Sequence, residues 1–189
     1  MNRILSLIGV VLVVGCGSPP PDGPYEGYYD NGQLWERVTY EDGERGGLYE
    51  GYYNNGLLGS KVTYKNGKWD GPYESYHDNG QLLTKTTYKD GEFDGPYEEY
   101  RDNGQLYMKT TYKDGELDGP YESYRDNGQL WEKTTWKDGE LDGPFEAFGE
   151  NGQLTWKGLN NMGEACGEWI EEGKTVTYDP CPPDLEDGN

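Results

Sequence analysis

Residues 119–142 read GPYESYRDNGQLWEKTTWKDGELD, and this stretch decides the fold. Asn127-Gly128 and Asp138-Gly139 separate short runs rich in Tyr, Thr and Trp, a pattern that is a strong signal of β-hairpins. Both dipeptides predict type I′ turns, with positive φ at both central residues. The stretch therefore predicts two antiparallel strands. No apolar stripe of helical period runs through it, so a helix is not expected.

The same stretch recurs along the chain with a period of 24 residues. Its first glycine recurs at Gly23, Gly47, Gly71, Gly95, Gly119, Gly143 and Gly167. A second series of glycines, each preceded by Asn, and a third, mostly preceded by Asp or Asn, keep the same period. Three series with one period indicate a repeat array. We predict an all-β fold, an elongated antiparallel meander of β-hairpin repeats, with six repeats over residues 23–166 and a degenerate capping repeat and tail over 167–189.

Strand alternation assigns side chains to the two faces of this sheet. It predicts that Leu130, Thr134 and Trp136 share one face and that Trp131 and Lys133 share the other. Aromatic columns also recur at the repeat period and are expected to pack between repeats, because aromatic rings bury a large area. The clearest column is Tyr25, Tyr49, Tyr73, Tyr97, Tyr121, Phe145 and Trp169.

The motif Tyr-x-x-Tyr-x-x-Asn-Gly-Gln-Leu, followed by Tyr-Lys-Asp-Gly and Asp-Gly-Pro-Tyr, resembles the MORN repeat in its variant common in bacterial proteins. The resemblance covers residues 23–166. It implies hairpin repeats in an elongated, twisted open sheet. Bacterial members of this family are often labelled antitoxin-like, and repeats in other members have been assigned roles in protein contact, oligomerisation and membrane association.

Residues 1–15 are predicted to be a signal peptide. The apolar run from Ile4 to Val14 is too short to span a bilayer, as is typical of a signal sequence. The run ends in Val-Val-Gly followed by Cys16, which resembles the bacterial lipobox and implies cleavage before Cys16 and lipid attachment to it. An ordinary secreted protein is the alternative. Residues 16–22 contain three consecutive prolines and predict an extended tether. The expected location is the bacterial cell envelope, and the outer membrane if the source is Gram-negative.

The chain is strongly acidic, with 36 Asp and Glu against 16 Lys and Arg and a formal net charge of -20. This charge excludes nucleic acid as a partner and favours a basic protein. Cys166 and Cys181 both lie in the capping repeat, where a disulfide would stabilise an exported protein by roughly 2–4 kcal/mol. Zinc binding is the competing idea, but the two cysteines have no histidine near them.

No catalytic, cofactor-binding or metal site is predicted, and we expect no enzyme activity. The single histidine, His77, is expected to be an exposed strand residue without a nucleophile beside it. Carboxylate pairs are too abundant in this chain to indicate a site. The Asp-Asn-Gly loops offer calcium-type oxygen ligands, but the requirements of tight turns explain those residues.

Two functions remain in view. The first is a protein-interaction or scaffold module that presents a repeated face to a partner, including a toxin that it neutralises. The second is binding of envelope glycans by exposed aromatic ladders, although the Gly-x-Trp-Tyr-Tyr signature of cell-wall-binding repeats is absent. The candidate binding surface is Trp35, Tyr107 and Trp131. Their column also contains Gly59, Leu83 and Thr155, so it does not keep a ring in every repeat, which favours the first function.

Overall fold

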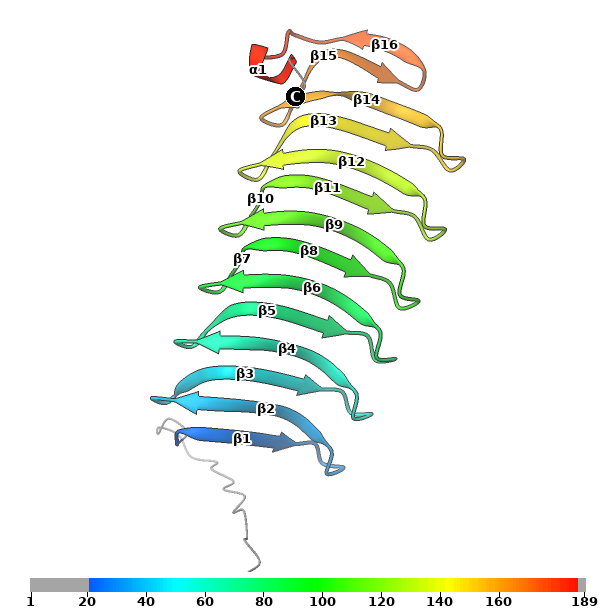
Figure 1. Ribbon diagram of the computed structural model, residues 1–189. Helices are drawn as coiled ribbons and strands as arrows, with labels where there is room; N and C mark the ends of the chain where they lie inside the picture. The colour runs from blue at the N-terminus through cyan, green and yellow to red at the C-terminus, as the bar shows by residue number, and fades with distance from the viewer. Residues whose placement is uncertain (1–20, 187–189) are drawn as a thin grey trace, which may run out of the picture.

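The computed structural model describes residues 21–186, and its strands form one antiparallel sheet ordered along the chain as a meander (Figure 1). The strands are β1 (Gly23–Tyr28), β2 (Leu34–Glu41), β3 (Glu44–Tyr52), β4 (Leu58–Lys65), β5 (Lys68–Tyr76), β6 (Leu82–Lys89), β7 (Glu92–Phe93), β8 (Gly95–Tyr100), β9 (Leu106–Lys113), β10 (Glu116–Leu117), β11 (Gly119–Tyr124), β12 (Leu130–Lys137), β13 (Glu140–Phe148), β14 (Leu154–Asn161), β15 (Glu164–Glu171) and β16 (Lys174–Thr177). The all-β prediction is confirmed. The chain then forms a single turn of helix, α1 (Pro183–Glu186), within the tail.

The Asp-Gly turns have the predicted type I′ geometry. Asp42 and Gly43, for example, have φ values of 52° and 76° and connect the directly paired residues Glu41 and Glu44. The tight two-residue turn holds each hairpin in register, because a type I′ turn matches the right-handed twist of its strands.

The turns at Asn31-Gly32 and the equivalent positions of the other repeats correct the prediction, because only their glycine has positive φ. In the first repeat, the Gly32 N–H donates to the Tyr29 carbonyl and the Tyr29 N–H donates to the Gln33 carbonyl, both at 2.8 Å. The loop thus has three residues, a type I turn followed by a left-handed glycine. The Asn31 side chain stabilises it by accepting a hydrogen bond from the Gln33 N–H at 3.0 Å.

A β-bulge follows each Asn-Gly turn and changes the assignment of faces. Tyr124 pairs with Leu130 and Ser123 pairs with Glu132, so Trp131 is an extra residue on β12. Leu130 therefore lies on the face opposite to Glu132, and the prediction that it shares a face with the later threonine and tryptophan of its strand is wrong. The extra residues of the six bulges are Trp35, Gly59, Leu83, Tyr107, Trp131 and Thr155.

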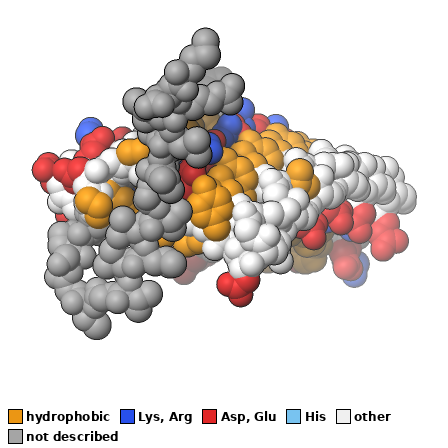
Figure 2. Space-filling model, turned by 90° about the horizontal axis from the view of Figure 1, so that it is seen from below, with side chains coloured by type: hydrophobic (Ala, Val, Ile, Leu, Met, Phe, Trp, Pro, Cys, Tyr) orange, Lys and Arg blue, Asp and Glu red, His pale blue; other side chains and the backbone are white. Residues whose placement is uncertain are grey.

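One face, which we call the aromatic face, carries the aromatic columns and most of the buried side chains. Small β-branched residues are buried between the rings: Val38, Val62, Thr86, Thr110 and Thr134. The aromatic columns on this face comprise Tyr25, Tyr40, Tyr49, Tyr64, Trp69, Tyr73, Tyr88, Phe93, Tyr97, Tyr112, Tyr121, Trp136, Phe145 and Trp169. Figure 2, which looks along the sheet from the β1 end, shows hydrophobic side chains gathered in a band, with acidic side chains beside it.

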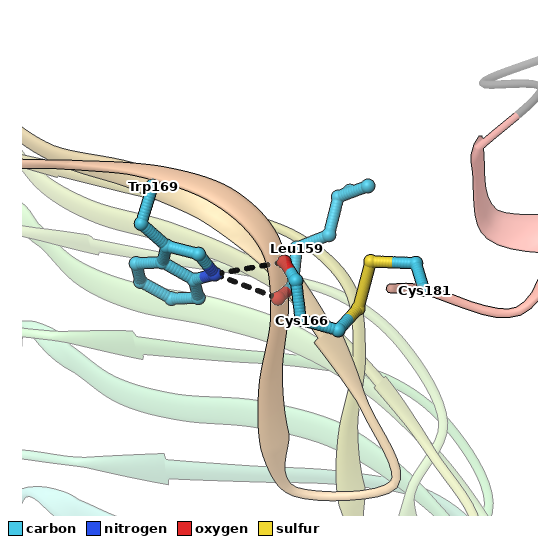
Figure 3. The surroundings of a disulfide bond; sticks show 4 residues. All are labelled: Leu159, Cys166, Trp169 and Cys181. Atoms are coloured by element: carbon cyan, nitrogen blue, oxygen red, sulfur yellow. Dashed lines mark hydrogen bonds between the residues drawn. A yellow bond between two sulfur atoms is a disulfide. The ribbon is translucent and has the colours of Figure 1, made fainter. Parts of the chain in front are cut away.

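The C-terminal repeat is built as a cap. Cys166 on β15 and Cys181 form a disulfide (Figure 3). The Trp169 indole is buried and its N–H donates to the Leu159 and Cys166 carbonyls at 3.0 and 3.1 Å. Trp169 fits only because Gly158 faces it, since a Cβ atom at Gly158 would lie 2.1 Å from the indole. The predicted degenerate unit thus closes the array with a larger ring.

Residues 1–20 and 187–189 lie outside the described residues. The predicted signal peptide, Cys16 and most of the proline tether fall in the first of these segments. In the part of the chain that the structure describes, no helix has the length and apolar character needed to span a bilayer.

Candidate interaction surface

The aromatic face carries an unbroken chain of ring contacts. Neighbouring ring centres lie 4.6 to 6.3 Å apart, mostly in edge-to-face geometry, as aromatic pairs prefer. Eight rings form it, in the order Tyr49, Tyr64, Trp69, Tyr73, Tyr88, Phe93, Tyr97 and Tyr112. Burial among these rings raises the pKa of Tyr88 to about 12, so its hydroxyl stays neutral at physiological pH.

Arg45 ends this chain of rings at the β3 side. Its guanidinium carbon lies 5.4 Å from the Tyr49 ring centre and 5.7 Å from the Tyr64 ring centre. Its Nη2 is 3.1 Å from Oε2 of Glu36, a carboxylate that is only 3% exposed. The face can therefore hold a guanidinium between a buried carboxylate and aromatic rings.

The opposite face carries an alternating row of charges, which we call the charge ladder. Each residue in the row is directly paired with the next, so that every acid faces a base on the neighbouring strand. The row is Glu26, Arg37, Glu50, Lys61, Glu74, Lys85, Glu98, Lys109, Glu122, Lys133, Glu146 and Lys157. Pairs of this kind contribute about 0.2–1 kcal/mol each and disfavour other registers. The ladder was not predicted from the sequence, although Glu and Lys alternate at fixed repeat positions.

In five repeats, a tyrosine two residues after the ladder glutamate donates a hydrogen bond to it. The Tyr76 hydroxyl, for example, donates to the Glu74 carboxylate. This hydrogen bond, together with the ion pair between Lys61 Nζ and Glu74 Oε2 at 2.9 Å, holds the pKa of Glu74 below its ordinary value. Glu74 is thus ionised at neutral pH.

A further column locks each repeat to the next, and it corrects the prediction for His77. His77 is part-buried at the start of a turn, and its Nε2 lies 2.9 Å from the Tyr100 carbonyl, so this nitrogen carries the proton. Equivalent residues donate to the equivalent carbonyl of the following repeat at 2.6 to 2.8 Å: Tyr29, Tyr53, Arg101 and Arg125. The common property of this column is a long side chain with a terminal donor. That property could be read from the sequence but was missed.

The candidate residues Trp35, Tyr107 and Trp131 all lie at bulges, and the structure brings only two of them together. The Arg101 guanidinium carbon lies 4.6 Å from the Tyr107 ring centre, and that of Arg125 lies 5.6 Å from the Trp131 ring centre. Tyr107 and Trp131 line the same shallow cleft of about 540 Å³ at the Asn-Gly edge. Trp35 is three repeats away from Tyr107 and packs over Gly27 instead.

Cys166 and Cys181 are consumed by their disulfide, so this pair offers no thiolate ligands for zinc. No group of three or more His, Cys, Asp or Glu side chains in the described residues is placed to hold a metal ion. The arrangement can bind by stacking, hydrogen bonding and charge.

Comparison with known proteins agrees with this geometry. Four segments match the MORN repeat variant: residues 21–42, 69–90, 93–114 and 117–138. No curated protein matches the chain. The segment between the first two matches forms the same hairpins, with strands β3 and β4 at the equivalent positions. The protein is therefore an open sheet of 24-residue β-hairpin repeats, four of which match the MORN repeat variant.

Proposed function

We propose that this protein is a lipid-anchored, non-enzymatic protein of the bacterial cell envelope whose sheet serves as a protein-interaction scaffold. The observation that carries the proposal is the chain of eight contacting rings on a sheet that has no second layer within residues 21–186. Each of these rings is half-buried, and together they leave a continuous, partly exposed apolar surface, which is typical of a site for another macromolecule.

Charge supports a basic partner. The charge ladder is internally balanced and includes six of the 16 Lys and Arg residues, so the acidic excess lies elsewhere, largely in the turns at both edges of the sheet. An acidic rim around an aromatic face would speed the encounter with a basic protein and discriminate against acidic ones. A basic toxin would be one such partner, as the antitoxin-like label of related bacterial proteins suggests.

The lipid anchor is proposed from the motif that ends at Cys16. Two or three acyl chains on this residue would hold the protein stably at a membrane, since each buried CH₂ contributes about 0.8 kcal/mol. Replacing Cys16 by Ser should abolish metabolic labelling with a palmitate analogue and release the protein from the membrane fraction. Labelling that persists in Cys16→Ser would refute the anchor.

The scaffold proposal is tested by crosslinking the protein in intact cells and identifying what co-purifies, with Cys16→Ser as the localisation control. We expect one dominant protein partner. Rings such as Tyr73 and Tyr97 also support the fold, so replacing them would change stability as well as binding. Substitutions at exposed positions are therefore the better test of the surface. Recovery of no protein partner from either form would contradict the scaffold function.

Glycan binding is a second candidate because Tyr107 and Trp131 line one cleft on neighbouring repeats. Trp131 is 45% exposed, which leaves its ring accessible for stacking on a sugar. The Trp131→Ala variant should then lose retention on envelope glycans, whereas Trp35→Ala, at the equivalent position of a distant repeat, should keep it. Equal retention of both variants, or none by the unmodified protein, would rule out the cleft as a sugar site.

A further inference from the structure

Glu36 and Glu132 occupy the same repeat position on the aromatic face, four repeats apart. Glu36 lies between Gly27 and Gly51 on the neighbouring strands, and Glu132 lies between Ser123 and Ala147. The other members of this column carry no charge: Ser60, Thr84, Met108 and Trp156. The chain thus places a carboxylate on its aromatic face at this position twice, and the two sites can be compared directly.

At the first site the carboxylate has an internal partner. Arg45 pairs directly with Tyr40 across the hairpin, and its Nη2 lies 3.1 Å from Oε2 of Glu36. The rings of Tyr49 and Tyr64 lie within 6 Å of the guanidinium carbon. Burial raises the pKa of Glu36 above its ordinary value, and the charge of Arg45 opposes this rise, so a charged donor and polarisable rings replace part of the water that the carboxylate has lost.

At the second site the partner is missing. Leu141 stands in the repeat position of Arg45, pairing directly with Trp136. Within residues 21–186, Glu132 makes no ion pair and no side-chain hydrogen bond, although burial is sufficient to raise its pKa above the ordinary value. The negative charge of Glu132 also contributes to the raised pKa of Tyr121, which places this ring near the carboxylate. A half-buried carboxylate left without a partner costs stability.

We propose that Glu132 and the aromatic side chains beside it form a recognition site for an arginine side chain of a protein partner. The partner's guanidinium takes the place that Arg45 fills at Glu36, pairing with the Glu132 carboxylate and stacking on nearby rings. Arginine suits this site because its planar guanidinium both stacks on rings and donates in parallel to a carboxylate. The inference rests on the proposed scaffold function and names the chemistry of the partner that the scaffold binds.

The test uses a minimal probe, the blocked tripeptide acetyl-Gly-Arg-Gly-amide, titrated into the full chain carrying Cys16→Ser. The neutral counterpart with citrulline in place of arginine measures the contribution of charge. Binding is followed by NMR through the indole N–H signals of Trp131 and Trp136. We expect one site for the arginine peptide, centred on these two signals, and at least about tenfold weaker binding of the citrulline peptide.

Two single-charge variants separate a specific site from general attraction to an acidic surface. Glu132→Gln should weaken the arginine peptide at least about tenfold, whereas Glu116→Gln, which removes an exposed carboxylate, should change binding less than about twofold. Circular dichroism confirms that each variant is folded. Equal weakening in both variants, or no binding of the arginine peptide to the unmodified chain, would overturn the proposal.

The internal pair at Glu36 provides a reciprocal exchange. Leu141→Arg should supply an internal guanidinium at the second site and abolish binding of the arginine peptide. Arg45→Leu should open the first site and raise the stoichiometry from one to two. Undiminished binding in a folded Leu141→Arg protein would overturn the proposal.

Crosslinking distinguishes failure of this site from failure of the scaffold function. A protein partner recovered by the unmodified chain but lost in Glu132→Gln supports both. A partner recovered equally by the two forms overturns the arginine site and leaves the scaffold function in place. Recovery of no protein overturns the scaffold function, and the peptide titration then decides whether Glu132 binds a guanidinium.

Discussion

Replacing Gly158 by Thr tests whether the cap depends on the missing side chain at this position. The equivalent positions in the earlier repeats carry Val or Thr, and each of those side chains is buried beside a smaller ring. At Gly158, an added Cβ would lie 2.1 to 2.4 Å from three atoms of the Trp169 indole. Because the contact is with a rigid, buried ring, the indole must leave its site.

The expected cost follows from these contacts. Overpacking a buried site costs about 1–3 kcal/mol. Loss of the hydrogen bonds from the indole N–H to the Leu159 and Cys166 carbonyls adds about 1 kcal/mol. We therefore expect Gly158→Thr to lower the free energy of unfolding of the cap by about 2–4 kcal/mol. Urea unfolding followed by tryptophan fluorescence measures the loss, and hydrogen exchange of β15 and β16 locates it.

A double variant and a control make the reasoning refutable. Adding Trp169→Tyr recreates the Thr–Tyr pairing of the earlier repeats and should recover more than about 1 kcal/mol, as coupled neighbours do. Gly149→Thr should cost little, because the atoms nearest to a Cβ there belong to the flexible end of the Gln153 side chain. A Gly158→Thr protein as stable as Gly149→Thr, or a double variant less stable than Gly158→Thr alone, would contradict the argument.

Other expected outcomes follow from the disulfide, the charges and the locking column. Replacing Cys166 and Cys181 by Ser should destabilise the cap by about 3 kcal/mol, measurable by urea unfolding, because the bond closes a 15-residue separation. Because the pKa of Glu74 is lowered in the folded protein, its ionised carboxylate stabilises the fold above the ordinary pKa of 4.5, and this stability is lost as the pH falls. In Glu74→Gln, the free energy of unfolding should therefore fall less steeply at acidic pH than in the unmodified protein. Burial raises the pKa of Glu132, so its ionised carboxylate destabilises the fold above pH 4.5. Glu132→Gln should therefore raise the urea midpoint of unfolding at neutral pH and give no gain below pH 4.5. His77→Arg should leave the melting temperature almost unchanged, whereas His77→Leu should cost about 1 kcal/mol of unfolding free energy, since it leaves the Tyr100 carbonyl without its donor.

The repeat period and turn dipeptides were sufficient to predict the meander. A 24-residue spacing with Asn-Gly and Asp-Gly turns leaves only hairpins of nearly fixed strand length, so strand existence and order followed directly. The assignment of faces was less predictable. Alternation assumes that successive residues point to opposite faces throughout a strand. The bulge at Trp131 inserts one extra residue, so Leu130 lies on the face opposite to the one that alternation predicts from the rest of β12. The Asp preceding Asn-Gly was the available signal for a longer turn.

The candidate binding residues came from a single column of the repeat, and the structure shows how they lie relative to one another. The sequence named Trp35, Tyr107 and Trp131, and the 24-residue period already separated Trp35 from Tyr107 by three repeats, but it did not show that Tyr107 and Trp131 line one cleft. The charge ladder and the locking column went unnoticed because their residues are polar, and polar positions were interpreted as solvent-facing. Comparing repeats column by column, rather than residue by residue, would have exposed both.

The locking column has a consequence for how such a protein can change its length. Each of the five junctions among the six repeats reuses one side-chain donor, one backbone carbonyl and one pair of opposite charges, whereas the junction to the cap, at Gly149 and Ile170, does not. Duplication or loss of a whole 24-residue unit in the gene therefore restores every junction. Each added unit lengthens the sheet by two strand spacings, about 10 Å. Selection can thus change the length of the sheet in uniform steps, while the cap and the first strands stay unaltered.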